Sequence, residues 1–145
     1  MRQVDDDYHY NFSSYISEAR CVYEAIKRLT GSSVVDIGSG YGFAKEFFPN
    51  GYIGIEPVLP IDSGNTALTI VDKYPLSTKV YFPDDVIAIS SFCMGYLCSE
   101  WEQLTLDFKY YCGEARLVDT RYFTKTNRCF VDNEMEIGLF RSMCR

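Results

Sequence analysis

The strongest constraint on the fold is the stretch VVDIGSGYG at residues 34–42. β-Branched apolar residues lead into an acidic residue, and three glycines then follow at alternate positions. This pattern predicts a buried strand that ends in a tight turn, where only hydrogen atoms face whatever lies above the backbone. A second apolar run, Tyr52–Ile55, ends in Glu56. A glycine-rich turn after one strand and a carboxylate at the tip of the next indicate a nucleotide or nucleoside site.

The length and composition fit one domain with a large core. The chain has 145 residues, which leaves little room for a second domain. Hydrophobic residues make up 47% of the chain, and this proportion argues against disorder. We therefore predict a single domain over residues 1–145, in which residues 1–13 form a mobile lead-in. Its aromatic residues Tyr8, Tyr10 and Phe12 are expected to cover either a ligand or the edge of the core.

Net charge and hydropathy narrow the classes of partner. A formal charge of −6 disfavours capture of a nucleic-acid backbone as the main source of affinity. No apolar run approaches the roughly 18 residues of a membrane helix, and residues 1–7 do not open a signal sequence. The expectation is a cytoplasmic protein that has no membrane partner and for which nucleic acid is a disfavoured partner.

Metal binding has little support in the sequence. The only histidine is His9, and the six cysteines form no C-x-x-C pair. We therefore predict no metal site. The cysteines are expected to be reduced and mostly buried, as is usual for a cytosolic protein.

Apolar periodicity predicts alternating helices and strands. The expected helices span residues 15–29, 43–48 and 100–111, and the expected strands span residues 33–37, 52–55, 67–71, 85–89, 115–123, 128–132 and 134–140. Gly113 is expected to end the third helix, and residues 133–134 to form a hairpin turn between the last two strands. This alternation predicts an α/β fold, with a mostly parallel sheet, helices on its faces and an antiparallel C-terminal strand pair.

The helical layer is expected to be reduced. Pro57, Pro60 and Gly64 fall where a second crossover helix would normally lie, and the preceding helix has about six residues. One face of the sheet would then be thinly covered. Because an exposed apolar face is costly, burial against another subunit follows as a hypothesis, either in a homo-oligomer or with a partner subunit.

The motif pair resembles class I S-adenosylmethionine-dependent methyltransferases, whose fold is Rossmann-like. The resemblance rests on Asp36-x-Gly38-x-Gly40-x-Gly42 after one strand and Glu56 at the end of the next. It extends to Asp72 at the third strand tip and to residues 85–91 as the fourth strand, so that it covers about residues 16–140. The spacing differs from the dinucleotide-binding G-x-G-x-x-G, in which the third glycine comes one residue later.

The resemblance implies S-adenosylmethionine as cofactor and a role for each matching residue. Asp36 would lie near the ammonium group of the methionyl part, and Glu56 would accept hydrogen bonds from both ribose hydroxyls. Asp72 would accept from the adenine amino group, although an ordinary loop carboxylate fits its position almost as well. The predicted cofactor-binding residues are Asp36, Gly38, Ser39, Gly40, Tyr41, Gly42, Glu56, Pro57, Asp72, Ser90 and Phe92. The backbone at Ser90 would lie near the sulfonium, and Phe92 would pack against the ligand.

The sequence departs from the family where the acceptor is usually recognised. Ser90-Ser91-Phe92-Cys93 replaces the Asn/Asp-Pro-Pro-Tyr/Phe of enzymes that methylate amino groups of bases or glutamine. The Lys-Asp-Lys-Glu set of ribose methyltransferases is also missing, and no catalytic base can be identified. The expected activity is therefore methyl transfer to a small molecule or a protein, with S-adenosylhomocysteine as product. Two alternatives stay open: an enzyme that degrades S-adenosylmethionine, and a catalytically silent subunit that binds it or stimulates a partner.

Overall fold

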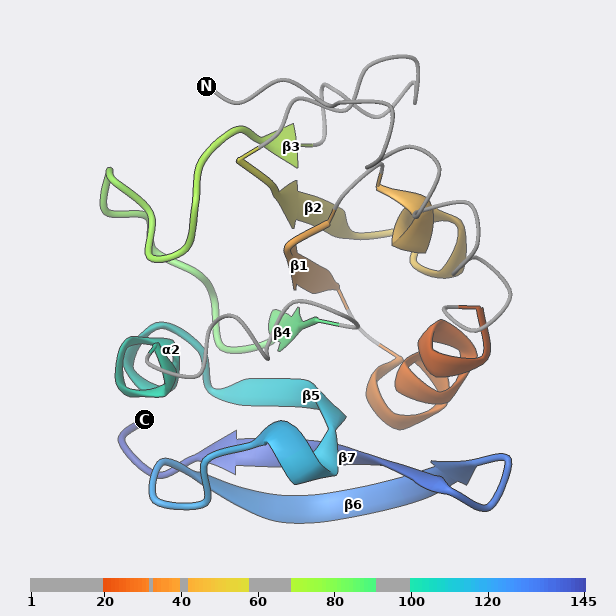
Figure 1. Ribbon diagram of the computed structural model, residues 1–145. Coiled ribbons are helices and arrows are strands. Elements are labelled where there is room, and N and C mark those ends of the chain that lie inside the picture. Colours follow the sequence, from red (N-terminus) through yellow and green to blue (C-terminus); the bar gives the residue numbers. More distant parts are fainter. Residues whose placement is uncertain (1–19, 32, 40–41, 58–68, 91–99) are drawn as a thin grey trace.

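The computed structural model describes residues 20–31, 33–39, 42–57, 69–90 and 100–145. These residues form one seven-stranded sheet in the order β3-β2-β1-β4-β5-β7-β6 (Figure 1). The strands are β1 (Val34–Ile37), β2 (Tyr52–Ile55), β3 (Thr69–Ile70), β4 (Ile87–Ile89), β5 (Tyr110–Glu114), β6 (Phe123–Val131) and β7 (Met135–Ser142). The predicted bounds of β2 agree with the structure, and those of β1 differ by one residue.

The sheet is mostly parallel, as the alternation of elements predicts. Strands β1 to β5 run parallel to their neighbours, whereas β7 lies antiparallel between β5 and β6. All residues of β1 and β4 are buried, which is typical of strands covered on both faces. The order of the five parallel strands is that of the first five strands of a Rossmann sheet. The α/β fold with an antiparallel C-terminal pair is therefore confirmed.

Helical segments cover both faces of the sheet (Figure 1). The helix at residues 20–30 and the 3₁₀ helix η1 (Phe43–Phe47) pack on one face, against a core that includes Val34 and Ile89. Helix α2 (Trp101–Asp107) packs on the other face, against a core that includes Val35 and Tyr111. The opposite faces of β1 thus supply alternate residues to two separate clusters.

Two apolar side chains near β2 and β3 are partly exposed. Ile53 lies on the α2 side of β2 beside the buried Val35, yet 42% of its surface is exposed. Val71, just after β3, is 39% exposed. Among the described residues the helical layer is reduced as predicted, because η1 has only five residues. Pro60 and Gly64, on which the predicted loss of the second crossover helix rests, lie outside the described residues. The association with another subunit stays a prediction.

Two predicted elements after residue 100 are wrong. The helix expected over residues 100–111 ends at Asp107, and Tyr110–Glu114 forms β5. The spacing of apolar residues predicts one long helix because Phe108 and Tyr111 continue the helical period of Trp101. In the structure these residues come from different elements and meet in one apolar cluster. Two tyrosines also favour a strand, and β5 gains a partner on each side.

Gly113 does not end a helix but lies within β5, and the Tyr111 ring rests over it. A Cβ at Gly113 would lie 2.4 Å from Tyr111 Oη, so this position requires glycine.

The strand expected over residues 115–123 is instead the 3₁₀ helix η3 (Ala115–Leu117) followed by turns, and β6 begins at Phe123.

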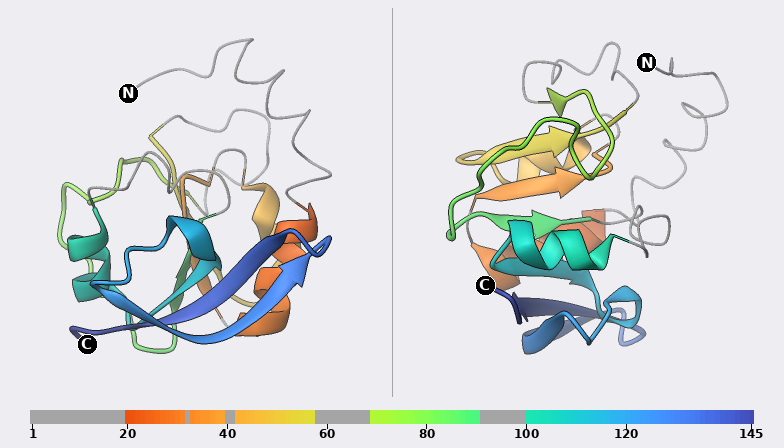
Figure 2. Two further views of the ribbon diagram at one scale, coloured as in Figure 1. Left: turned by 60° about the horizontal axis from the view of Figure 1, so that its bottom comes forward. Right: turned by 90° about the vertical axis from the view of Figure 1, so that its left-hand side faces the viewer.

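The C-terminal hairpin is confirmed and forms one edge of the sheet (Figure 2). Its turn at residues 132–134 contains Asp132 at φ 53° and Asn133 at φ 58°. Asp and Asn tolerate this left-handed conformation better than most residues, and it suits hairpin turns.

Several predicted absences concern only part of the chain. None of the described helices is long and apolar enough to cross a membrane. The described residues contain no group of three or more His, Cys, Asp or Glu side chains placed to hold a metal ion.

The four cysteines among the described residues have free thiols, but only Cys112 is fully buried. Cys21, in the helix at residues 20–30, and Cys144, near the C-terminal residue, are exposed. The expected burial is wrong for both.

Candidate functional site

Most of the predicted site residues that the structure describes lie at the carboxyl ends of β1, β2 and β4, and Asp72 lies just after β3. From β1 the chain continues to β2 and β3 on one side, whereas β4 and β5 lie on the other side. The gap between β1 and β4 is therefore a topological switch point, where α/β sheets usually bind ligands beyond the carboxyl ends of the strands. Gly38 and Ser39 follow β1 at this point, and Ser90 follows β4.

The first part of the glycine turn is hydrogen-bonded to the tip of β2. The backbone N–H groups of Gly38 and Ser39 both donate to the carbonyl oxygen of Ile55, at 2.8 and 3.1 Å. Gly38 has a φ of 75°, a left-handed conformation that explains the glycine. These bonds bring the turn next to Glu56, which follows Ile55 directly.

The turn closes at Gly42, whose N–H donates to the carbonyl oxygen of Ser39 at 3.0 Å. Gly42 also has a φ of 75°, and it precedes the first residue of η1. Gly40, Tyr41 and Phe92 lie outside the described residues. Tyr8, Tyr10 and Phe12 of the expected lead-in lie outside them as well.

Asp36 is fully buried in the middle of the sheet. The Tyr52 hydroxyl donates a hydrogen bond of 2.8 Å to its Oδ2 atom. Its Oδ1 atom has no hydrogen-bond partner among the residues that the structure describes. A buried carboxylate oxygen without a partner is costly, so it is a feature that requires an explanation.

Burial raises the pKa of Asp36 from 3.8 to about 7. The Tyr52 hydrogen bond opposes this effect, and the nearby charge of Glu56 adds to it. Burial and the neighbouring Asp36 carboxylate in turn raise the pKa of Tyr52, so its hydroxyl remains a hydrogen-bond donor at neutral pH. The sheet therefore holds an acidic group that titrates near neutrality.

Gly54 makes room for this cluster. It is the direct neighbour of Asp36 across the β1–β2 ladder. A Cβ at Gly54 would lie 2.4 Å from Ser39 Oγ and 2.6 Å from Ser39 Cβ. The Ser39 side chain thus occupies the space above Gly54, beside Tyr52 and at the end of β1.

Two acidic residues are held by hydrogen bonds from their backbone N–H groups to the same carbonyl oxygen, at the end of β3. The N–H groups of Glu56 and Asp72 both donate to the carbonyl oxygen of Ile70, at 3.1 and 3.0 Å. Glu56 is 7% exposed, which is unusual for a glutamate. Pro57, the next residue, is exposed.

The Asp72 carboxylate is engaged within its own loop. Its Oδ2 atom accepts from the N–H and the hydroxyl of Ser77, at 2.8 and 2.7 Å. Its Oδ1 atom accepts from the N–H of Lys73 at 2.8 Å. These bonds, led by the Ser77 N–H, hold the pKa of Asp72 below its usual value. Among the two functions expected for Asp72, the loop role has contacts that explain it, and the adenine contact stays a prediction.

Ser90 closes the site on the β4 side. The residue is 3% exposed, and its carbonyl oxygen lies 3.5 Å from the Tyr111 hydroxyl.

Sequence reasoning missed Tyr52 as a site residue, although it is the one donor that a described residue supplies to the Asp36 carboxylate. Its position two residues before Gly54 puts it on the same face of the sheet as Asp36. Only the register between the strands reveals this.

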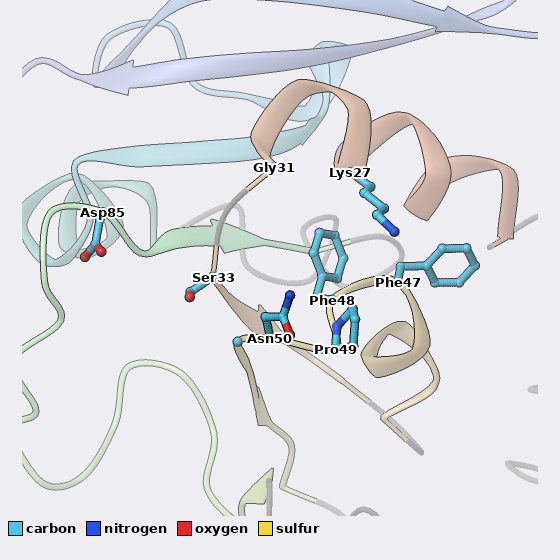
Figure 3. Close-up of a pocket in the computed structure, with 9 residues that line it drawn as sticks. Lys27, Gly31, Ser33, Phe47, Phe48, Pro49, Asn50 and Asp85 are labelled. Atoms are coloured by element: carbon cyan, nitrogen blue, oxygen red, sulfur yellow. The ribbon is translucent and has the colours of Figure 1, made fainter.

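Two hollows lined by described residues lie away from this cluster. One, of about 370 Å³, opens at the amino ends of β1, β2 and β4, where Lys27, Ser33 and Asn50 line it (Figure 3). The other, of about 250 Å³, lies between α2 and the loop before β4 and includes Gln103 and Arg145. Neither contains a predicted cofactor-binding residue.

Comparison of the chain with protein-family models and with curated proteins gives no match. The assignment of a function therefore depends on the motif, the fold and the geometry at the carboxyl ends of β1, β2 and β4.

Proposed function

We propose that the chain binds S-adenosylmethionine at the carboxyl ends of β1, β2 and β4 and transfers its methyl group to an acceptor. The observation that supports this proposal is the pair of hydrogen bonds from Gly38 and Ser39 to Ile55. They join a glycine turn to the strand tip that carries Glu56, at the switch point of a Rossmann-like sheet. A small molecule or a protein side chain is the favoured acceptor.

The residues present fit the chemical groups of this cofactor. Glu56 directly follows β2, and the two oxygen atoms of a carboxylate suit the two neighbouring hydroxyls of a ribose. Asp36 has an oxygen without a partner among the described residues, and the ammonium of the methionyl part would satisfy it. The positive φ of Gly38 leaves the backbone open at the turn between them.

The cofactor, when bound, supplies a sulfonium with a methyl group that is ready to leave. The chain contributes mainly orientation, because transfer requires the nucleophile, the methyl carbon and the sulfur in line. Glu56 would hold the ribose, Asp36 would hold the amino-acid end of the cofactor, and the backbone around Ser90 would border its sulfur. No residue is assigned as a catalytic base.

Calorimetric titration tests the binding step. S-Adenosylmethionine and S-adenosylhomocysteine are titrated into wild type and Glu56→Gln, because the amide keeps the shape but weakens the hydrogen bonds. We expect Glu56→Gln to bind about tenfold or more weakly, since each bond to a charged group contributes roughly 1.5–3 kcal/mol. Glu46→Gln is the matched control, because Glu46 lies in η1 and pairs with Arg20 at the surface. No binding to folded wild type would overturn the proposal.

Product analysis then separates methyl transfer from its alternatives. The protein is incubated with S-adenosylmethionine, with and without a panel of small-molecule and protein acceptors. S-Adenosylhomocysteine that forms only with an acceptor supports methyl transfer. Methylthioadenosine that forms without any acceptor indicates degradation of the cofactor, and binding without turnover indicates a silent or partner-stimulating subunit.

A further inference from the structure

We propose that Tyr52 is a positioning residue, which fixes the Asp36 carboxylate for a cationic group of the ligand, and that ligand binding releases one proton from Asp36. This inference rests on the proposed function and specifies how the amino-acid end of the ligand is recognised. It concerns a residue, Tyr52, outside the sequence motif.

The geometry divides the two oxygen atoms of Asp36 between two tasks. Oδ2 accepts the Tyr52 hydroxyl at 2.8 Å, and this bond restricts rotation of the carboxylate. Oδ1 is buried and has no partner among the described residues. Because a buried acceptor gains most from a charged donor, an ammonium group is the chemistry that suits Oδ1.

The groups around Asp36 leave this need unmet. Tyr52 and Glu56 act on it from β2, and Tyr23 on the helix at residues 20–30 acts on Tyr52 in turn. On the β4 side its neighbour is Ile89, which cannot titrate. No basic side chain of the described residues acts on Asp36. We infer that the ligand supplies the positive charge.

Proton release follows from this environment. Burial raises the pKa of Asp36 to about 7, so near neutral pH the carboxyl group is partly protonated in the empty protein. An ammonium group beside Oδ1 favours the carboxylate, and the Asp36 proton then passes to the solvent. The ligand keeps its own proton, so that one carboxylate and one ammonium remain in contact.

The test compares two ligands that differ at this end. S-Adenosylhomocysteine carries the ammonium group, whereas methylthioadenosine keeps the nucleoside and lacks the amino-acid part. We expect the affinity for S-adenosylhomocysteine to increase about tenfold between about pH 6 and pH 8, as Asp36 loses its proton before binding. The affinity for methylthioadenosine should stay constant over the same range. Titrations in buffers of different ionisation enthalpy should show proton release for the first ligand alone.

Tyr52→Phe isolates the positioning role. Loss of the hydroxyl removes the hydrogen bond that lowers the pKa of Asp36, so the midpoint of the pH profile should move upward. We expect severalfold weaker binding of S-adenosylhomocysteine near neutral pH and unchanged binding of methylthioadenosine. Tyr74→Phe is the matched control, because the Tyr74 hydroxyl donates to the Asp107 carboxylate away from the site, at 2.6 Å. It should change neither profile.

The outcomes separate this inference from the proposed function. Equal pH profiles for the two ligands in wild type would overturn the inference and leave the nucleoside site intact. If neither ligand binds the folded protein, both proposals fail. The wild-type comparison decides the proton release even if Tyr52→Phe does not fold.

Discussion

The structure contains two tyrosine–carboxylate pairs of the same chemistry in different surroundings. Tyr52 donates to Asp36 at 2.8 Å in the middle of the sheet, and Tyr74 donates to Asp107 at 2.6 Å at the end of α2. The second oxygen of Asp107 accepts from Gln103 at 2.9 Å. The second oxygen of Asp36 has no partner among the described residues.

The difference arises from the elements that carry the two carboxylates. Gln103 and Asp107 are four residues apart on one helix, so their side chains are neighbours by the geometry of the helix itself. Asp36 lies in a strand paired on both sides, where neighbouring backbone groups already bond in the ladders. Both oxygen atoms of Asp107 have partners, whereas one oxygen of Asp36 has none among the described residues, and we propose that a ligand supplies it.

The largest expected effect tests whether the core around Asp107 and α2 contributes to stability without affecting ligand binding. Phe108 follows Asp107, is fully buried and stacks on Phe82 with ring centroids 4.6 Å apart. Phe108→Ala should lower the free energy of unfolding by about 3–5 kcal/mol, because it leaves a cavity in the core. Chemical denaturation measures this loss. Affinity for S-adenosylhomocysteine, corrected for the folded fraction, should stay as in wild type, and a specific loss of affinity would contradict the division between the two sides.

The next prediction concerns the dependence of stability on pH. The pKa of Asp36 is about 7 in the folded protein against an ordinary 3.8, so between these values only the folded state keeps the proton. Stability is therefore lost as the pH rises through about 7. The free energy of unfolding of Asp36→Asn, relative to wild type without ligand, should increase by about 3 kcal/mol between about pH 5 and pH 8.

Urea titrations at several pH values measure this difference. Asp107→Asn, measured in parallel, corrects for the general effect of converting the carboxylate of a tyrosine–carboxylate pair to an amide. If the difference in unfolding free energy between Asp36→Asn and wild type does not change with pH, the pKa of Asp36 is not raised in the folded protein without ligand. The contrast between the two tyrosine–carboxylate pairs would then disappear.

Much of the frame of the site could be predicted from the sequence. Short apolar runs located β1 and β2, and the glycines marked the turn, because local backbone conformation depends on local residue types. The position of Glu56 at the tip of β2 followed from the same pattern. Gly38 and Gly42 do adopt the left-handed conformation that favours glycine.

Contacts between distant segments could not be read in the same way. The Tyr52–Asp36 bond joins residues 16 positions apart and depends on the register of two parallel strands. β5 was missed because Phe108 and Tyr111 continue the apolar period of α2 across a change of element. The loop role of Asp72 had a local signal, since aspartate often accepts hydrogen bonds from N–H groups that follow it.

A smaller effect should distinguish the two tyrosine hydroxyls. Tyr52→Phe removes a hydroxyl that donates to a buried carboxyl group, and its cost should increase by about 1 kcal/mol as Asp36 ionises between about pH 6 and pH 8. Tyr74→Phe leaves Asp107 with its Gln103 partner, and its cost should be the same at both ends of that range. Thermal or urea unfolding of the two variants measures the costs. Parallel pH profiles would show that the two pairs are equivalent.

The smallest expected effect places a third carboxylate in the comparison. Both oxygen atoms of Asp72 accept hydrogen bonds within its loop, from Lys73 and Ser77, so Asp72 belongs with Asp107 rather than with Asp36. Asp72→Asn should therefore change the affinity for S-adenosylhomocysteine by less than about twofold. Calorimetry measures this affinity beside that of Glu56→Gln. A loss as large as that of Glu56→Gln would assign Asp72 to the adenine. It would also mean that a carboxylate whose two oxygen atoms already have partners in the protein can still bind the ligand.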